Sequence, residues 1–485
     1  MDIGNLSNIL YPIISELILA VGALACLLVD MFLKKDSYRI SSYIAYISVV
    51  LAIYTLFIYD KYDFSILQGL FTLDLENFPF KFLVLLVTLL ILTFSDFFLV
   101  SKNVHYGEYH FLILISALSV QMVISSENLV MIFFALECAS LASYVLCAIR
   151  NRSEQSIESA MKYFITGSLA AGMLLYGTSF LYGAAHSMNL NVIFNSIQLA
   201  KNNSLYLLGI TLVVSGLCVK LAIAPFHWWS LDVYKGAPTP VTAFISTVSK
   251  IGVFWLLTRF VIGIGDSYPA ISNALLSLAL LSILFGAVAA YYYSNLKSIL
   301  AMSSVNQFGY LLLILVLNQG DSMMDIFFYL TIYCTMSVGI LAVLSILESR
   351  MDDGIGLDLK DIKGLVYKCP KLSIALLIFL LSFAGIPLTA GFIGKFRIFS
   401  SVFVQGSVLS IAVTVIASII SLYYYLRIIS NLFQREEEYG SIDYSNLKGA
   451  FLNTSYFGVI LSVILVIVLG IMPNFFLMLG SYTNF

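Results

Sequence analysis

Charged residues are scarce in this sequence: they make up 11% of its 485 residues, whereas hydrophobic residues make up 60%. Soluble domains carry about 25% charged residues. A chain this poor in charge has too few polar side chains to cover a soluble surface, and its net charge of −2 gives no basis for binding nucleic acid. The composition therefore predicts an all-α, multi-pass membrane protein in a lipid bilayer, with little room for a soluble domain.

Cysteine and histidine are also rare, with six and four residues. The cysteines form no CxxC pair and five of them lie within apolar runs, which argues against a disulfide framework, a metal site or an iron–sulfur cluster. We expect them to be buried as small apolar side chains. Three histidines on or beside loops are expected at the surface: His105, His110 and His186.

Two further features are missing. The amino terminus has no basic segment before its first apolar run, about residues 13–33, and this run is long enough to span. We therefore expect a retained helix and not a cleaved signal peptide. The longest loops, 349–371 and 431–454, contain no Gly-rich phosphate loop, nucleotide fingerprint or paired-carboxylate hydrolase site. Their mixed charge fits either a solvated connector or a docking site for a neighbouring subunit.

Long apolar runs, in contrast, are abundant. Because a transmembrane helix needs about 20 apolar residues, the sequence predicts fourteen spans. The seventh and the twelfth contain a proline in mid-run, Pro225 and Pro387, so both are expected to be broken helices. The fourteen spans are expected at about 10–33, 41–59, 78–100, 109–125, 128–149, 158–185, 205–230, 240–263, 271–293, 297–317, 325–348, 372–402, 406–430 and 455–480.

Basic residues fall mainly on one set of alternate loops. Sixteen, among them Lys297, lie on that set, three (Lys61, Lys81 and Lys201) lie on the other, and six of the 25 lie within spans. Loops rich in lysine and arginine stay in the cytoplasm. We therefore assign the first set to the cytoplasmic side and expect both termini on the opposite side of the membrane.

The segment 220–244, KLAIAPFHWWSLDVYKGAPTPVTAF, is unusually polar for a membrane protein. Broken helix at membrane depth survives only where protein buries it or where it lines a wet cavity. An ionisable residue at this depth marks an ion or proton path by default. Lys220 before Pro225 thus predicts an interrupted helix with a titratable group at the break. His227 follows, either as a proton relay or as a cap for freed carbonyls. Two tryptophans are expected to be interfacial anchors: Trp228 and Trp229.

Other ionisable residues also lie inside predicted spans. Glu137 and Lys250 lie about nine and ten residues into the fifth and eighth spans, which is ~14 Å deep and near the bilayer centre at 1.5 Å per residue. Lys395 lies in the twelfth span and Lys162 near the cytoplasmic end of the sixth. Burial favours the neutral forms of such groups, and an approaching opposite charge favours the charged forms. A Glu–Lys pair can therefore take up or release a proton as its members approach or separate.

Structural roles are the alternative for these residues. A buried Glu–Lys pair can be a purely structural ion pair, and a basic side chain near a helix end can extend into the interface. The first alternative applies to Glu137, Lys220 and Lys250, and the second to Lys162, Arg259 and Arg397.

The positions of the two broken helices suggest an internal repeat. Spans four to eight and nine to thirteen each hold five helices with the broken helix in fourth place, which predicts two inverted repeats. The chain is then divided into a three-helix segment (1–108), a first repeat (109–263), a second repeat (264–430), and a loop with a C-terminal helix (431–485). The match is imperfect, because lysine precedes proline in the first break and follows it in the second.

Four motifs resemble the antiporter-like membrane subunits of proton-pumping NADH:quinone oxidoreductase, respiratory complex I. They are the segment 220–244, STVSKIG (246–252), LKSILAMSSVNQFGYLL (296–312) and AGIPLTAGFIGKF (384–396). The form DVYKGAPTPVTAF is more similar to the subunit N group, to which mitochondrial subunit 2 is related, than to its larger paralogues or to the multisubunit cation antiporters. The resemblance covers most of the chain, best over about 109–430.

The resemblance implies a proton channel built from the two repeats and joined by a hydrophilic axis of buried charges. It implies that Glu137 pairs with Lys220, that Lys162 modulates this pair, that Lys250 connects the two halves, that Lys395 lies toward the exit, and that His227 is the histidine after the break. One departure is Gln307, where many relatives have a histidine in the tenth helix. Proton relay there would need water or Tyr310.

The resemblance also implies partners: other membrane subunits of complex I and, indirectly, its peripheral redox arm. Flavin, iron–sulfur clusters and the quinone site belong to other subunits, so we expect no cofactor in this chain. The leading hypothesis is a subunit that translocates protons, driven by NADH oxidation elsewhere in the complex. The alternatives are a cation/proton antiporter subunit without a redox partner and a structural scaffold without a path.

Overall fold

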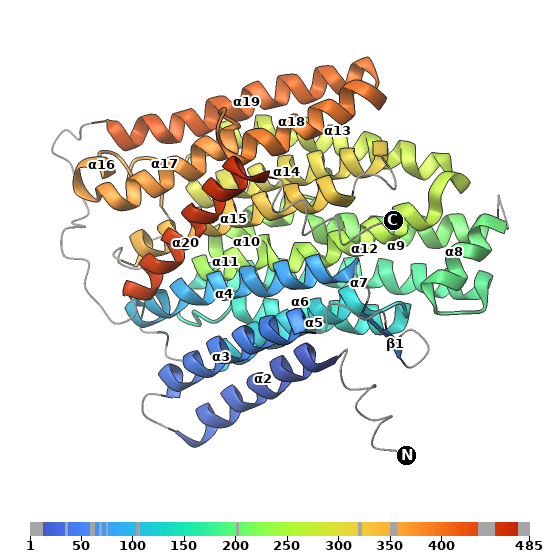
Figure 1. Cartoon of the computed structure of the whole chain (residues 1–485), viewed down its shortest axis with the longest axis horizontal. Coiled ribbons are helices and arrows are strands. Elements are labelled where there is room, and N and C mark those ends of the chain that lie inside the picture. Colours follow the sequence, from blue (N-terminus) through green and yellow to red (C-terminus); the bar gives the residue numbers. More distant parts are fainter. Residues whose placement is uncertain are drawn as a thin grey trace.

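The computed structural model describes residues 13–33, 37–58, 64–66, 70–73, 76–102, 104, 107–199, 203–318, 323–349, 357–434 and 452–473. Long helices lie side by side with roughly parallel axes, from α2 at one edge of the molecule to α19 at the opposite edge (Figure 1). Within the described residues, thirteen helices are long and apolar enough to cross a membrane. The all-α, multi-pass fold class predicted from the sequence is confirmed.

The first half of the chain supplies the following helices: α2 Ile14–Phe32, α3 Ser37–Ile58, α4 Asn77–Ser101, α5 Glu108–Ser125, α6 Leu129–Cys147, α7 Glu154–Ala185, α8 Leu190–Leu199, α9 Ser204–Leu221, α10 Trp228–Gly236, α11 Thr239–Ser246 and α12 Val248–Ile264. The second half supplies a 3₁₀ turn, Gly265–Ser267, and then α13 Pro269–Tyr292, α14 Leu296–Asn318, α15 Met323–Glu348, α16 Leu365–Lys368, α17 Pro370–Ala384, α18 Ala390–Gln405, α19 Val408–Phe433 and α20 Leu452–Ile471.

One of the fourteen predicted spans, the twelfth along the chain, is not among these thirteen helices. It is divided into α17 and α18, of 15 and 16 residues, which are each too short to count as a full span. The predicted seventh span is likewise divided into α9 and α10. A third interruption was not expected: the eighth span bends at Thr247, whose hydroxyl donates to the carbonyl oxygen of Ala243 and so competes with the helical bond.

The two broken helices end in the same local geometry. At the end of α9, Ala222 is left-handed (φ 60°) and the Ile223 amide donates to the Cys218 carbonyl at 3.0 Å. At the end of α17, Gly385 is left-handed (φ 80°) and the Ile386 amide donates to the Leu381 carbonyl at 3.2 Å. Both are Schellman-type ends, which satisfy carbonyls that the interrupted helix leaves free. The peptide bond Ala224–Pro225 is cis.

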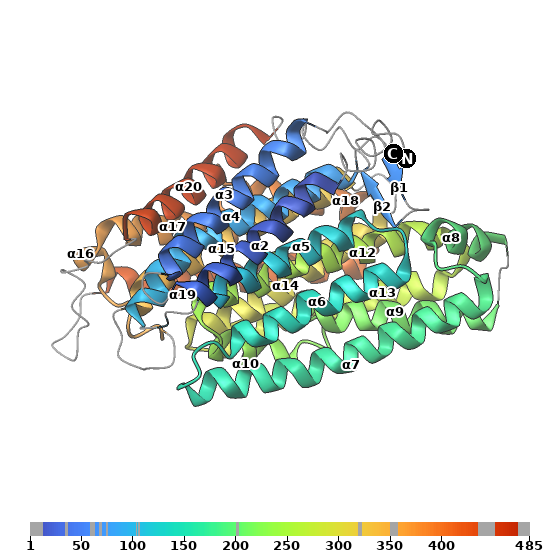
Figure 2. The same cartoon turned by 90° about the horizontal axis from the view of Figure 1, so that it is seen from below.

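Short elements mark the two ends of the bundle. The strands β1 (Phe64–Ile66) and β2 (Phe71–Leu73) pair antiparallel, and they lie with α8 at one end, whereas α16 lies at the other (Figure 2). None of these elements was predicted, because hydropathy identifies only runs long enough to span. The α16 end carries the loops that were predicted to be cytoplasmic.

Close packing of helices depends on small residues at their contacts. A Cβ atom at Gly216 of α9 would lie 3.0 Å from the Ala170 carbonyl oxygen of α7, and one at Gly286 of α13 would lie 2.6 Å from the Asn306 amide nitrogen of α14. Lipid is as apolar as these helices, so close backbone contact is what holds them together. The most enclosed helix is α15, whose most apolar window is 100% buried, against 33% for α7.

Several residues predicted to lie in loops or at the surface are buried. Lys81 and Lys297 were counted among loop residues, but they lie inside α4 and α14 and are 0% and 2% exposed. His110, expected at the surface, is 1% exposed. His186 is exposed as predicted, and His105 lies outside the described residues. Both lysines lie next to the ends of their predicted spans, where hydropathy cannot separate a loop from a buried first turn.

The described part of the loop 349–371 is not a solvated connector. Leu357, Leu359 and Ile362 are buried, and Leu359 and Leu357 exchange backbone hydrogen bonds with the turn between α13 and α14. This segment closes the α16 end of the bundle. The loop 431–454 lies almost entirely outside the described residues. Of the cysteines, four are buried as predicted, Cys369 is partly buried, and Cys138 is exposed on α6.

Candidate functional site

An ion pair joins α6 to the end of α9. Lys220 Nζ lies 3.0 Å from Glu137 Oε1 and donates to Ser140 Oγ at 2.7 Å. The two side chains are 9% and 22% exposed. Lys220 is in the last turn of α9, directly before the break, so its amine is fixed at the point where the helix stops. A cavity of about 30 Å³ lies beside it, with a mainly apolar lining that also includes the hydroxyl groups of Ser143 and Tyr144.

The tryptophans after the break have different environments. Trp228 is 57% exposed, as expected for an interfacial residue, but Trp229 is 3% exposed. The Trp229 indole donates to the Val219 carbonyl oxygen at 2.9 Å and stacks on the Tyr163 ring at 5.0 Å between centroids. The prediction that Trp229 is an interfacial anchor was therefore wrong: where the break of α9 removes the usual amide donor one turn later, its indole gives the Val219 carbonyl a second donor beside the Ala222 amide, which lies at 3.1 Å.

Lys162 does not contact the Glu137–Lys220 pair. Its amine lies 2.7 Å from both Glu158 Oε1, one turn earlier on α7, and Asp232 Oδ2 of α10. The three side chains are 42%, 63% and 52% exposed. Lys162 therefore links α7 to α10 at the surface of this chain and is held by acidic partners, which differs from a side chain that simply extends into the interface.

Lys250 lies near the start of α12, three residues after the bend at Thr247, and is 1% exposed. Its amine donates to Ser304 Oγ of α14 at 2.8 Å and lies 4.5 Å from the centroid of the Phe308 ring. The Tyr333 hydroxyl of α15 lies 3.0 Å from the same Ser304 oxygen. No carboxylate in the described part of the chain forms an ion pair with Lys250, so only hydroxyls and an aromatic face are available to an ammonium here.

Lys395 binds the end of a half-helix. Its amine, on α18, donates to the carbonyl oxygens of Phe383 and Ala384 at 2.9 and 3.3 Å and lies 3.4 Å from Ser421 Oγ. These carbonyls belong to the last turn of α17, where the helix dipole places partial negative charge. Lys395 is 5% exposed. At the second break, the amine of Lys395 is thus held by carbonyl oxygens, whereas at the first break the amine of Lys220 is held by a carboxylate.

The neighbours of His227 and Gln307 differ from the lysines and the Tyr310 hydroxyl that the sequence suggested. The His227 ring packs against Phe285 at 4.4 Å between centroids and contacts none of the predicted lysines. Gln307 accepts a hydrogen bond from the hydroxyl of Tyr329. Tyr310 instead donates to the Thr414 carbonyl oxygen. Tyr329 and Tyr425, and not Tyr310, are therefore ionisable neighbours of Gln307.

The two arginines that were expected to extend into the interface are held by carboxylates. Arg259 Nη1 donates to the Ser126 carbonyl oxygen at 2.7 Å, and Arg259 Nη2 lies 3.8 Å from Glu127. Arg397 pairs with Asp325 of α15. Both are partly buried: Arg259 joins α12 to the turn between α5 and α6, and Arg397 joins α18 to α15.

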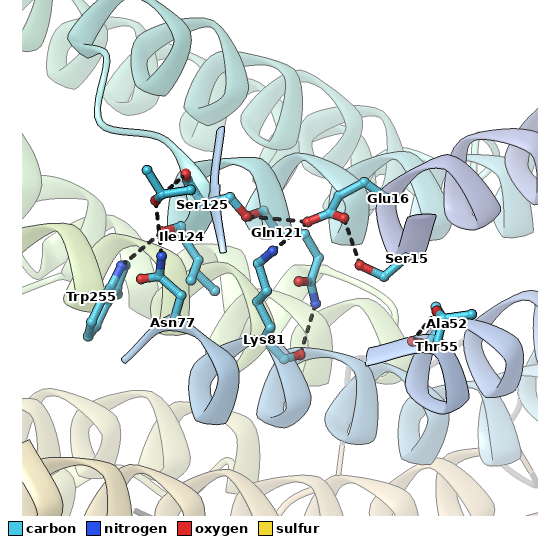
Figure 3. A network of polar contacts seen from close by, with 11 residues as sticks. Ser15, Glu16, Ala52, Thr55, Asn77, Lys81, Gln121, Ile124, Ser125 and Trp255 are labelled. Atoms are coloured by element: carbon cyan, nitrogen blue, oxygen red, sulfur yellow. Dashed lines mark hydrogen bonds and ion pairs between the residues drawn. The ribbon is translucent and has the colours of Figure 1, made fainter. Parts of the chain in front are cut away.

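A buried pair that the sequence analysis missed joins α2 to α4. Figure 3 shows Glu16, Lys81 and Ser125 pointing toward one another from α2, α4 and α5. Lys81 Nζ lies 2.7 Å from Glu16 Oε1, and Ser125 Oγ donates to the same oxygen at 3.3 Å. The Gln121 amide donates to the Lys81 carbonyl oxygen at 2.9 Å. Both charged side chains are at most 2% exposed, so they neutralise each other away from water.

Two further charged clusters were also missed. Near the other end of α4, Asp96 Oδ1 lies 2.9 Å from His110 Nε2, and the Ser42 hydroxyl donates to its other oxygen. On α14, Lys297 Nζ lies 3.0 Å from Glu348 Oε2 of α15, and both side chains are 3% exposed. The signal that could have found them is an ionisable residue at the edge of an apolar run, as in FPFKFLVLL around Lys81.

Comparisons with known proteins agree with this architecture. The family model described as NADH:quinone oxidoreductase/Mrp antiporter, transmembrane, matches residues 126–421. Subunit N 1 of NADH-quinone oxidoreductase from Aquifex aeolicus (strain VF5) is 35% identical over 422 residues, which cover 87% of this chain and 89% of that protein.

Solved structures show the same fold. A chain of respiratory complex I from Thermus thermophilus with bound aureothin superimposes with a TM-score of 0.80 at 30% identity, covering 96% of this chain and 98% of that one. A chain of the Mrp complex from Dietzia sp. DQ12-45-1b has a TM-score of 0.83 at 20% identity, covering 98% and 96%, and shares the fold.

The chain therefore belongs to the NADH:quinone oxidoreductase/Mrp antiporter family of membrane proteins. Within this family its curated relatives carry the name subunit N of NADH-quinone oxidoreductase, and the resemblance to the antiporter-like subunit of respiratory complex I is confirmed.

Proposed function

We propose that this chain translocates protons across the bacterial cytoplasmic membrane as subunit N of a respiratory complex I. The observation that carries the proposal is the Glu137–Lys220 pair, which lies at the end of a half-helix and beside a cavity of about 30 Å³ whose mainly apolar wall carries several hydroxyl groups. A cavity of this size and polarity has room for water. An ionisable pair at such a place is expensive unless it serves transport.

Lys220, Lys250 and Lys395 are proposed to carry the proton between the two halves. Approach of Glu137 favours the ammonium form of Lys220, and separation favours the neutral amine and releases a proton. Lys250 and Lys395 have no carboxylate partner within the described residues; they are surrounded by hydroxyls and carbonyls. Such groups tolerate either charge state better than a fixed ion pair does, which suits transfer. Lys162 and His227 are proposed to modulate this transfer through α10. Lys162 binds Asp232 of α10, and His227 directly precedes this helix.

The driving reaction is placed in partner subunits. The chain is proposed to bind no flavin, iron–sulfur cluster or quinone, and to receive energy through contacts with other membrane subunits and, indirectly, the peripheral arm. The charge network then acts as an element with two arrangements whose balance the redox reaction shifts. Both termini are proposed to face the periplasm.

The test is proton transfer by the assembled complex in sealed vesicles. Lys220→Ala and Glu137→Ala are expected to leave assembly intact and to lower the number of protons moved per electron. Lys235→Ala and Glu154→Ala are the matched controls, because both side chains are exposed on neighbouring helices. A normal proton-to-electron ratio in both Lys220→Ala and Glu137→Ala would favour a scaffold.

The antiporter alternative predicts a different result. Vesicles that contain this chain without peripheral redox subunits would then exchange sodium for protons. Co-purification of flavin and iron–sulfur subunits with the chain supports the redox-driven function instead.

A further inference from the structure

The buried Lys297–Glu348 pair lies at the α16 end of the bundle. Lys297 is in the first turn of α14 and Glu348 is the last residue of α15. Arg150, which follows the end of α6, is close enough to interact electrostatically with Lys297. Leu357 and Leu359 of the closing segment pack over the same end. The pair therefore lies at this end of the bundle and is covered by the closing segment.

The same pair contacts the linker between α10 and α11. Lys297 Nζ donates to the Ala237 carbonyl oxygen at 3.1 Å, and the Thr239 hydroxyl donates to Glu348. This linker connects the half-helix that follows Lys220 to the helix that leads to Lys250. A buried salt bridge by itself adds little stability relative to an apolar pair, so its presence at this junction calls for another explanation.

A line of polar side chains runs from Glu348 toward Lys250. On α15, Ser345, Ser337 and Tyr333 precede Glu348 by 3, 11 and 15 residues, spacings that keep them on one side of the helix. The Ser345 hydroxyl is buried and makes no hydrogen bond within the described part of the chain. Tyr333 reaches Ser304, the hydrogen-bond partner of Lys250.

α14 provides the opposite wall. Ser304 lies seven residues after Lys297, which is two helical turns or about 10 Å along the axis. Beside these helices, a small cavity of about 10 Å³ is lined by three apolar side chains and by the hydroxyl side chains of Tyr234, Ser246, Ser303, Ser337 and Tyr333. This volume is at the lower limit for one water molecule, which is about 10–15 Å³. The polar groups of α14 and α15 thus face one another between the ion pair and Lys250.

We infer that Glu348, held by Lys297, is the proton-uptake group for Lys250 at the α16 end. This inference rests on the proposed function. A proton from the aqueous phase binds the Glu348 carboxylate and ends its attraction to Lys297. The proton then passes along the hydroxyls of α14 and α15 to the uncharged amine of Lys250, and the carboxylate forms again. One proton enters and one reaches Lys250, so charge and atoms balance.

The test compares three variants in the assembled complex, with Lys220→Ala as the reference. Glu348→Gln is expected to lose the same share of redox-driven proton flux as Lys220→Ala. Lys297→Met/Glu348→Gln removes both charges, so no unpaired charge remains buried. This double variant is expected to melt at the wild-type temperature while its proton flux stays low. Thr239→Val removes the hydrogen bond from Thr239 to Glu348 but keeps the carboxyl and the Lys297–Ala237 contact, and it is expected to pump normally.

The outcomes distinguish a failure of the uptake role of Glu348 from a failure of the proposed function. If the double variant pumps normally, or if Thr239→Val loses as much flux as Glu348→Gln, the pair only positions the linker and the inference is overturned. If Lys220→Ala lowers the flux and Glu348→Gln does not, the uptake role fails and the proposed function stands. If neither lowers the flux, the proposed function itself fails.

Discussion

The amine of Lys395 lies 2.9 Å from the carbonyl oxygen of Phe383, the residue that occupies in α17 the place that Lys220 occupies in α9. Both residues precede a left-handed residue by two positions, and an isoleucine follows that residue in each case. The two breaks therefore each hold one amine at the same point of the same local structure, although the lysines come from opposite sides of the proline. This explains why the sequence pattern of the two repeats matched only in part.

Replacing Lys395 with methionine is expected to impair stability and proton transfer together. The substitution leaves the Phe383 and Ala384 carbonyl oxygens, which Lys395 now binds, without that donor. A buried polar group without a partner costs about 1–3 kcal/mol. The expected result is a lower melting temperature of the purified complex and a lower proton-to-electron ratio.

Lys371→Met is the matched control for Lys395→Met. Lys371 is exposed in the first turn of α17, so the same change of side chain there should alter neither quantity. A Lys395→Met complex with normal stability and normal pumping would show that the contact to the half-helix has no part in either.

Gly385 is expected to tolerate no side chain. Its φ of 80° is left-handed, and a Cβ atom would lie 3.0 Å from Lys395 Cδ. The left-handed conformation costs a residue with a Cβ atom about 1–2 kcal/mol. Gly385→Ala should therefore lower the melting temperature of the complex and displace the amine of Lys395, and the proton flux should fall with it.

Gly172→Ala tests whether the expected losses of stability and proton flux are specific to the glycine at the break. Gly172 lies within α7, and a Cβ atom there would meet nothing within 4 Å. Alanine is favoured over glycine in a helix by about 0.5–1 kcal/mol, so this variant should be at least as stable as the wild type. Equal losses in both variants would argue against a special requirement at Gly385.

The broken helices and the two members of the first ion pair could be singled out because each contradicts the composition around it, whereas the pairing itself was implied by the family resemblance. Proline in mid-run and a lysine beside it stand out in an apolar sequence, and so does Glu137. These signals are local and do not depend on which helices pack together.

The other buried pairs could not be assigned because their meaning depends on tertiary contacts. Lys81 and Lys297 lie near helix ends, where a lysine is equally consistent with a loop. Only the packing of α2 against α4, and of α14 against α15, brings Glu16 and Glu348 to them. Hydropathy does not reveal such contacts, because membrane helices are apolar on faces that meet lipid as well as on faces that meet protein.

The Glu16–Lys81 pair is expected to contribute to assembly and not to proton transfer. It lies between α2, α4 and α5, apart from the Lys220–Lys250–Lys395 series. Removing one partner of a buried pair leaves an uncompensated charge and costs about 3–5 kcal/mol. Lys81→Met and Glu16→Gln should each reduce the amount of assembled complex on native gels.

The double variant Lys81→Met/Glu16→Gln should restore most of that assembly, since it leaves neither charge unpaired. The complex that does assemble should show a normal proton-to-electron ratio in all three variants. A ratio that falls in the double variant in spite of restored assembly would place this pair in the proton path.

Trp229→Phe is expected to disturb the break that positions Lys220. Phenylalanine keeps an aromatic ring beside Tyr163 but loses the indole donor to the Val219 carbonyl oxygen, at 2.9 Å. That carbonyl is adjacent in sequence to Lys220 and keeps the Ala222 amide as its other donor, at 3.1 Å, so the substitution removes one hydrogen bond, worth about 0.5–1.5 kcal/mol. The variant should melt at a lower temperature and pump fewer protons per electron, whereas Trp228→Phe, on a side chain that is 57% exposed, should do neither. If the two substitutions behave alike, the indole of Trp229 does not hold the break, and the end of α9 is fixed by its backbone hydrogen bonds alone.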